Sequence, residues 1–154
     1  MARLARILLD GSITPVTPDG DELVAGDGRR IPEADATYLP PSEPSKILCV
    51  HLNHISRVHE FQITLSDTPT YFKKPVSALN GHRGHVVRPA RYKWLTYEGA
   101  VVIIIGRPCR NVSTADARAY LAGYSLGNNS GLHDLTAPAT GPTLRVQHSH
   151  PLCP

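Results

Sequence analysis

The sequence has few aromatic residues and no apolar run long enough to cross a membrane. Aromatic residues make up 6% of the 154 residues, while 14 prolines and 12 glycines interrupt the chain. Frequent Pro and Gly mark turns and short elements, which argues against a bundle of long helices. A chain of this length with 41% hydrophobic residues can nevertheless bury one core. We therefore expect a globular fold with many short elements.

Charge of one sign is not concentrated anywhere either. The net charge is +3, and the 16 Lys and Arg residues are scattered without a basic block or interleaved aromatic residues. Proteins that bind nucleic acid usually carry a clustered basic surface, so we expect no nucleic-acid partner. Asp10 interrupts the first apolar residues too early for a secretory signal, and three cysteines form no disulfide framework. We expect a cytoplasmic protein without a membrane partner.

The strongest local signal is the run of five β-branched residues from Val101 to Ile105, which Gly106 ends. Such residues suit an extended backbone, and a run without a polar face predicts a strand buried on both faces, in the middle of the core. Glu98 stands just before this strand. The residues alone leave open whether Glu98 is a ligand, a catalyst or an ordinary carboxylate at a strand end.

Composition divides the chain into three regions. Residues 1–38 alternate short apolar pieces with Asp-Gly turns, which predicts a small piece of antiparallel hairpins. Residues 39–44 form a Pro-rich link, because proline stiffens the chain and withholds ladder donors. Residues 45–154 are predicted to form the main domain.

Within the main domain we expect strands and two helices. The apolar runs predict a buried strand over 46–50, a strand over 70–74 and a late strand at 144–146, and residues 53–63 could form about three helical turns.

The clearest helix signal lies in residues 111–124, where Ser113 and Asp116 form a capping box and Gly123 can end the helix. The residues that would form its apolar stripe are Ala117, Tyr120, Leu121 and Tyr124.

An ordered set of short motifs resembles the fumarylacetoacetate hydrolase family, and within it the branch of homoprotocatechuate degradation, whose enzymes are decarboxylases and isomerases. The motifs are Pro44 to Asn53, Phe72-Lys73-Lys74-Pro75, Gly81-His82-Arg83-Gly84, Tyr97-Glu98, Ile105-Gly106-Arg107, Ala122-Gly123-Tyr124 and Asn128. The resemblance implies a mainly β fold with a few helices (α+β), a mixed β roll. Family members continue past the point where this chain stops, so we expect its front part, incomplete at the carboxyl end.

The resemblance also implies a divalent cation, usually Mg²⁺ or Mn²⁺, held by a Glu-x-Glu pair before the central strand and by a later Asp. Here the first Glu is Glu98, the second position is Ala100, and the Asp position is Asn129. Asn129 could alternatively be an ordinary turn residue. Because oxygen sites bind hard cations according to their charge, one carboxylate in place of three predicts weak binding.

The family's proton-transfer residues are matched as unevenly. Its catalytic His falls on Arg57, which stays protonated, whereas the partner Glu matches Glu60 and His59 lies nearby. The family's active-site Lys falls on Gln147. We predict Glu60 and His59 as residual catalytic residues.

Lys74 and Arg83 are the predicted substrate-binding residues, because each could face a carboxylate of a dicarboxylate substrate. Lys74 could instead be an ordinary surface lysine at a strand end. His82 with His85, or His148 and His150 with Cys153, could approach a zinc ion, but neither group is a full ligand set on one element.

Three hypotheses for the function remain open. The first is a metal-assisted decarboxylase, isomerase or C–C hydrolase domain for 2-oxo or 2-hydroxydienoate dicarboxylates of aromatic catabolism, with impaired activity. The second is a non-catalytic subunit that assembles with an active homologue. The third is a truncated product that does not fold alone, since unfinished sheets leave unpaired edges. A homo-oligomer or hetero-oligomer with a family member is expected.

Overall fold

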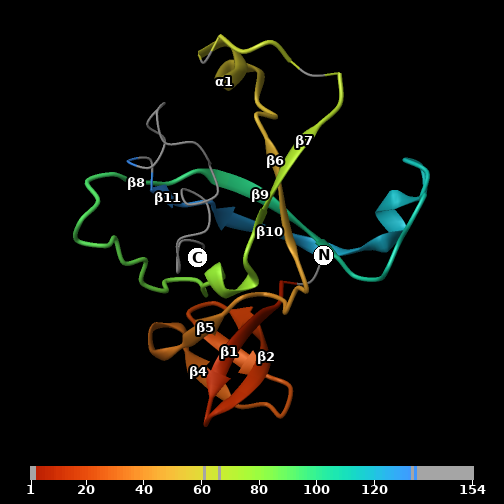
Figure 1. Ribbon diagram of the computed structural model, residues 1–154. Coiled ribbons are helices and arrows are strands. Elements are labelled where there is room, and N and C mark those ends of the chain that lie inside the picture. The colour runs from red at the N-terminus through yellow and green to blue at the C-terminus, as the bar shows by residue number, and fades with distance from the viewer. Residues whose placement is uncertain (1–2, 61, 66, 133, 135–154) are drawn as a thin grey trace.

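The structure is a computed structural model that describes residues 3–60, 62–65, 67–132 and 134 (Figure 1). Strands dominate and the helices are short, so the predicted mainly β fold with a few helices is confirmed. The described strands form one sheet of five strands and three pairs of strands. No helix in this described part is long and apolar enough to span a membrane.

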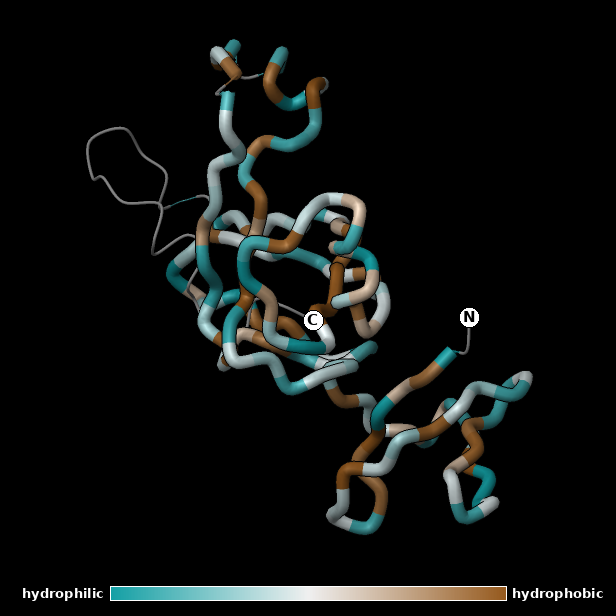
Figure 2. Tube along the Cα trace, turned by 90° about the vertical axis from the view of Figure 1, so that its right-hand side faces the viewer, coloured by the Kyte–Doolittle hydropathy of each residue, from teal (hydrophilic) through white to brown (hydrophobic). Residues whose placement is uncertain are grey.

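The amino-terminal sheet has the strand order β4-β3-β2-β1-β5 and forms a lobe of its own (Figures 1 and 2). Its elements are β1 (Ala5–Leu9), β2 (Ser12–Asp19), β3 (Glu22–Ala25), β4 (Arg30–Pro32), the 3-10 helix η1 (Glu33–Asp35) and β5 (Thr37–Leu39). Leu9 pairs with Ser12, which leaves a two-residue loop. Both loop residues, Asp10 and Gly11, have positive φ, as a type I′ hairpin turn requires. The predicted antiparallel hairpins are confirmed.

The buried core of the described residues lies mainly in this sheet. Four side chains from three neighbouring strands form its cluster: Ile7, Val16, Leu23 and Ala25. Tyr38 and other half-buried residues pack against the cluster. Alternate residues of a strand point to one face, so three adjacent strands suffice to assemble this core.

A second pair of strands, β6 (Ile47–His51) and β7 (Thr70–Lys74), forms a long antiparallel hairpin. The helix α1 (Ile55–Glu60) lies at its far end, away from the other sheets (Figure 1), and the 3-10 helix η2 (Val76–Ala78) follows β7. Both strands lie where the sequence predicts them. The first is not buried, however, because Leu48 and Val50 are exposed, and α1 has six residues rather than about three turns.

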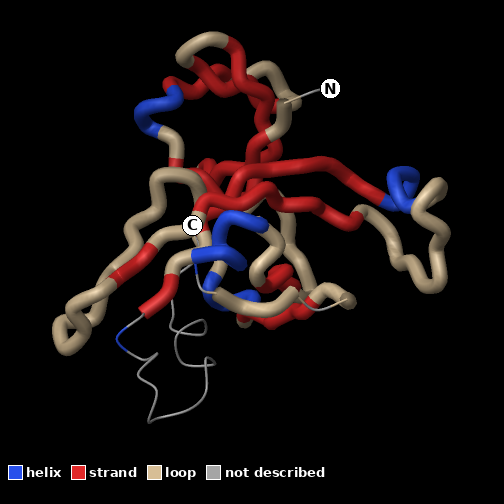
Figure 3. Tube along the Cα trace, turned by 90° about the horizontal axis from the view of Figure 1, so that it is seen from above, coloured by secondary structure: helices blue, strands red, loops and turns tan. Residues whose placement is uncertain are grey.

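The last strands form two short ladders that follow each other along the same two chain segments. The first ladder pairs β8 (Leu95–Thr96) with β11 (Gly131–Leu132), and the second pairs β9 (Gly99–Ile105) with β10 (Leu121–Asn128). Seen from above, β9 and β10 run together toward the 3-10 helix η3 (Ala117–Tyr120) that precedes β10 (Figure 3). Residues 97–98 and 129–130 lie between the ladders.

The prediction that β9 is buried on both faces is wrong for the described chain. Val101, Ile103 and Ile105 are exposed, and Val102 is partly exposed as well. The strand itself forms as expected, because β-branched residues favour an extended backbone. Burial needs other layers, and within the described residues β10 is the single strand that pairs with β9.

The predicted helix over 111–124 is also wrong. One contact of the capping box forms, since the backbone amide of Asp116 donates to Ser113 Oγ at 3.2 Å. The second bond joins the two side chains, because Ser113 Oγ donates to Asp116 Oδ2 at 2.6 Å. Only η3 follows, and the chain then enters β10. Seven residues of β10 pair with β9, and this tertiary pairing overrides the local helical pattern. The strand predicted at 144–146 lies outside the described residues.

Candidate functional site

Glu98 and Asn129 lie opposite each other where the two short ladders meet. The backbone amide of Asn129 donates to the backbone carbonyl oxygen of Glu98 at 2.8 Å, and the backbone amide of Glu98 donates to Asn128 Oδ1 at 3.0 Å. The side chains also meet, since Asn129 Nδ2 donates to Glu98 Oε2 at 2.5 Å. The two predicted metal-ligand positions, 31 residues apart in sequence, are therefore in direct contact.

The side-chain oxygen of Asn129 and the residue that follows it are buried. Asn129 Oδ1 is buried and has no hydrogen-bond partner among the described residues. The next residue, Ser130, is buried, and its carbonyl oxygen accepts a hydrogen bond of 2.9 Å from Lys74 Nζ. Lys74 is only 3% exposed, so the alternative of an ordinary surface lysine is wrong. The turn between β10 and β11 thus contacts a carboxylate through Asn129 and an ammonium group through Ser130.

The position of Lys74 predicts a large contribution to stability. Replacement of Lys74 by Met keeps most of the aliphatic stem but leaves the Ser130 carbonyl without this donor. We expect the free energy of unfolding to fall by about 1–3 kcal/mol, as for other lost hydrogen bonds to charged groups. Urea denaturation measures this loss, and the exposed Lys46→Met is the control, expected within about 0.5 kcal/mol of the parent. Equal losses in the two variants would contradict this role.

The predicted catalytic residues Glu60 and His59 lie in α1, at the end of the β6–β7 hairpin (Figure 1). Both are exposed. Glu60 Oε2 accepts a hydrogen bond of 2.5 Å from Arg57 Nη1, one turn earlier on the helix. The residue that replaces the family's histidine therefore forms an ion pair with the glutamate. The structure does not bring these side chains to the Glu98–Asn129 contact.

Arg83 contacts the amino-terminal sheet instead of the Glu98 region. Its guanidinium lies 3.3 Å from Glu33 Oε1 and donates to the Glu33 carbonyl oxygen at 3.4 Å. The Tyr38 hydroxyl donates to the same carboxylate at 3.1 Å, and the Tyr38 ring meets His82 edge to face. Partial burial raises the pKa of Tyr38, and the hydrogen bond to Glu33 raises it further. Arg83 thus joins the 81–84 loop to the first sheet.

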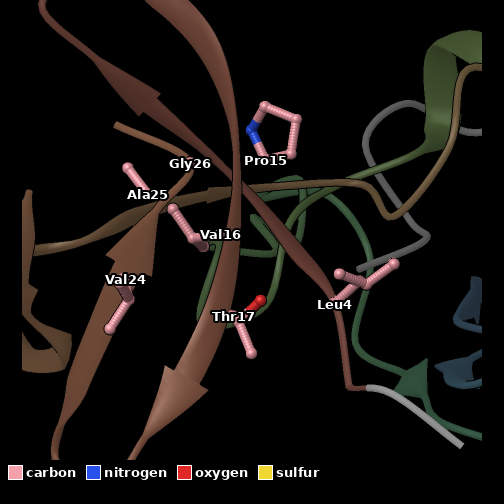
Figure 4. A pocket seen from close by; sticks show the side chains of 7 residues that line it. All are labelled: Leu4, Pro15, Val16, Thr17, Val24, Ala25 and Gly26. Atoms are coloured by element: carbon pink, nitrogen blue, oxygen red, sulfur yellow. The ribbon is translucent and has the colours of Figure 1, made fainter. Parts of the chain in front are cut away.

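A hollow of about 270 Å³ lies in the amino-terminal sheet, away from all these residues (Figure 4). Its lining consists of Leu4, Pro15, Val16, Thr17, Val24, Ala25 and Gly26. None of these side chains is titratable or can coordinate a metal strongly. The hollow offers space for an apolar group but no catalytic chemistry.

The donor set around Glu98 does not fit a tightly bound divalent cation. The buried Asn129 Oδ1 is an oxygen of the right kind, and Glu98 adds one carboxylate. Ala100 adds no ligand, and the Asn129 amide nitrogen, a hydrogen-bond donor, already occupies Glu98 Oε2. Hard cations select sites by the number and charge of their oxygen ligands, and this site offers one charge. The described residues also contain no cluster of three His, Cys, Asp or Glu side chains able to hold a metal.

The sequence predicted Glu98 and Asn129 as metal ligands and Lys74 as a substrate-binding residue, but not the part played by Ser130. Ser130 accepts the hydrogen bond from Lys74 through its backbone carbonyl oxygen. Every residue has this group, so the residue type does not reveal the contact. The Gln147 position lies outside the described residues, as do His148, His150 and Cys153 of the possible zinc group.

Comparisons with known proteins identify the family of the chain. Residues 46–154 match the family described as "Fumarylacetoacetate (FAA) hydrolase C-terminal". A protein of Archaeoglobus fulgidus is 34% identical over 135 residues, which cover 87% of this chain and 54% of that protein. The homoprotocatechuate catabolism bifunctional isomerase/decarboxylase of Escherichia coli is 32% identical over 114 residues, 74% of this chain and 27% of that protein.

Solved structures share the fold. The 5-carboxymethyl-2-hydroxymuconate delta-isomerase of Mycobacterium smegmatis superposes with a TM-score of 0.80 at 30% identity, covering 99% of this chain and 63% of that one. The 2-hydroxyhepta-2,4-diene-1,7-dioate isomerase of Mycobacterium marinum gives 0.78 at 26% identity. This chain thus spans about half the length of the first curated relative and under two thirds of these structures. By its matched residues and its fold, the chain belongs to the fumarylacetoacetate hydrolase family.

Proposed function

We propose that the chain is a domain for 2-oxo or 2-hydroxydienoate dicarboxylates of aromatic catabolism, in which metal-assisted isomerisation, decarboxylation or C–C hydrolysis is impaired. The observation that supports it is the 2.5 Å contact between Asn129 and Glu98 at the family's metal-ligand positions. Family members generally use a divalent metal. In this proposal Mg²⁺ or Mn²⁺ binds weakly, with Glu98 and Asn129 as residual ligands.

The charges around this contact suit an anionic substrate only in part. Lys74 places a buried positive charge beside the turn that carries Asn129, which favours a nearby carboxylate. Arg83 is engaged by Glu33, so its predicted role toward substrate is the weaker of the two. Glu60 with His59 is the proposed residual acid–base pair, and the Glu60 carboxylate is engaged by an ion pair with Arg57. These features together support low turnover, and we propose that the reaction takes place in the cytoplasm.

Metal and substrate titrations test the proposal. We expect Mg²⁺ and Mn²⁺ to bind the chain with a Kd weaker than about 1 mM in calorimetry, because one carboxylate stands where the family has three. Exchange of the methylene protons of oxaloacetate with D₂O, followed by NMR, is expected to exceed the buffer rate by a few-fold at most. Glu98→Gln is expected to return exchange to the buffer rate.

Two outcomes would decide against the proposal. If the chain does not bind oxaloacetate and does not exchange its protons faster than the buffer does, the non-catalytic subunit is the better hypothesis. Fast exchange with metal binding far tighter than millimolar would show that activity is not impaired. Glu98 is exposed, so the variant is expected to fold, and an unchanged melting curve verifies this.

A further inference from the structure

The two ladders beside Glu98 follow one register. Both the pairing of β8 with β11 and the pairing of β9 with β10 place Glu98 opposite Asn129 without a slip. The backbone amide of Asn129 donates to the Glu98 carbonyl oxygen at 2.8 Å, as in a hydrogen-bonded pair of an antiparallel ladder. The two ladders are therefore one antiparallel ladder that is interrupted at residues 97–98 and 129–130.

The side chain of Asn128 replaces a backbone group at this interruption. In a hydrogen-bonded antiparallel pair, each residue donates to the other and accepts from it. Asn129 donates to Glu98 in this way, but the backbone amide of Glu98 donates to Asn128 Oδ1 at 3.0 Å. Because a backbone amide can only donate, the Asn128 atom that faces it is the side-chain oxygen. Asn128 Oδ1 thus takes the part that the Asn129 carbonyl oxygen has in a regular ladder.

This replacement holds the backbone of Glu98 from two sides. Its amide is bound by the side chain of residue 128, and its carbonyl oxygen is bound by the backbone of residue 129. Local interruptions of a ladder re-aim side chains, as β-bulges do beside active sites. At this interruption the side-chain amide of Asn129 meets Glu98 Oε2 at 2.5 Å. A rotation of Glu98 away from Asn129 would break the bond to Asn128.

We propose that Asn128 is a positioning residue, which holds the Glu98 backbone so that the Glu98 carboxylate faces the side chain of Asn129. Asn128 acts through the backbone of Glu98, so it is neither a ligand nor a catalytic residue. The effect of Asn128 on turnover rests on the proposed function. Its effect on the contact between Glu98 and Asn129 depends on neither metal binding nor turnover.

Nuclear magnetic resonance of the Asn129 side-chain amide tests the proposal. The signal is assigned by its loss in Asn129→Asp, and its proton that donates to Glu98 is expected to resonate downfield of a solvent-exposed asparagine amide. Asn128→Leu has a similar size but no acceptor, and we expect the signal to move to the solvent-exposed position. Asn128→Asp keeps an oxygen for the Glu98 amide, and we expect the parent signal to be retained.

Thr96→Val is the matched control. The Thr96 hydroxyl donates to the Gly131 carbonyl oxygen at 3.1 Å, so this variant also removes one bond between a side chain and the backbone across the same two segments. It is expected to leave the Asn129 signal in place. Asn128→Ala repeats the test with a smaller side chain if the leucine variant does not fold. The proposal is overturned if removal of the acceptor at 128 leaves the signal unchanged, or if Thr96→Val moves it equally far.

Proton exchange of oxaloacetate separates this proposal from the proposed function. Where the parent exceeds the buffer rate, we expect Asn128→Leu to return exchange to that rate and Asn128→Asp to retain most of it. Unchanged exchange in Asn128→Leu would contradict the positioning role. If the parent itself shows no exchange, the proposed function fails, while the Asn129 signal still decides whether Asn128 positions Glu98.

Discussion

Replacement of Ala100 by Glu together with Asn129 by Asp is expected to tighten Mn²⁺ binding about 100-fold, because the site then offers three carboxylates instead of one. Ala100 lies across from Gly127 and is exposed, so a longer side chain meets no side chain on the partner residue. The change at 129 also removes the amide donor that occupies Glu98 Oε2. Calorimetry and the electron paramagnetic resonance of free Mn²⁺ measure the affinity.

The control for this variant keeps its shape and removes one charge. Ala100→Gln with Asn129→Asp has nearly the same volume but one carboxylate fewer, and we expect it to bind Mn²⁺ clearly less tightly. Adding Glu98→Gln to the variant with Ala100→Glu and Asn129→Asp should weaken Mn²⁺ binding by about a further tenfold, for the same reason. If the double variant bound Mn²⁺ no better than the parent, residues 98, 100 and 129 would not form a metal site.

Replacement of Gly81 by Ala is expected to destabilise the protein by about 2–3 kcal/mol or more. A Cβ atom at this position would overlap the Tyr38 carbonyl oxygen and carbon, which are backbone atoms of β5 and cannot move aside as a side chain does. Overpacking against rigid neighbours typically costs about 1–3 kcal/mol, and this overlap is severe. The 81–84 loop would then move away from β5, and the contact between Arg83 and Glu33 would be lost. Equilibrium unfolding in urea gives the loss of free energy.

Gly26→Ala is the matched control, because a Cβ atom at Gly26 meets nothing within 4 Å and the residue does not have a positive φ. The same glycine-to-alanine change there is expected to be neutral or slightly stabilising. A similar cost at both positions would show that the 81–84 loop is not held tightly against β5.

The candidate site could be predicted in part because its side chains carry chemistry. Glu98 and Asn129 follow a motif pattern, and the structure places them in contact. The surroundings were not predictable in the same way. Whether Lys74 is buried depends on which chain segments pack over it, and Arg83 is engaged by Glu33, a partner 50 residues away that spacing alone does not reveal.

The sequence by itself determined the local elements whose signals are short in range. The Asp10-Gly11 turn, the strands β6, β7 and β9 and the Ser113 cap all form where residue type predicts them, because turn chemistry, β-branching and capping act within a few residues.

Only the tertiary structure determined that residues 121–128 form a strand and how far β9 is buried. Residues with a helical sequence pattern form β10 because they pair with β9. The apolar strand β9 is exposed because too few described residues pack over it. Both depend on segments distant in sequence. A run of apolar residues therefore specifies a strand, whereas its burial depends on what packs against it.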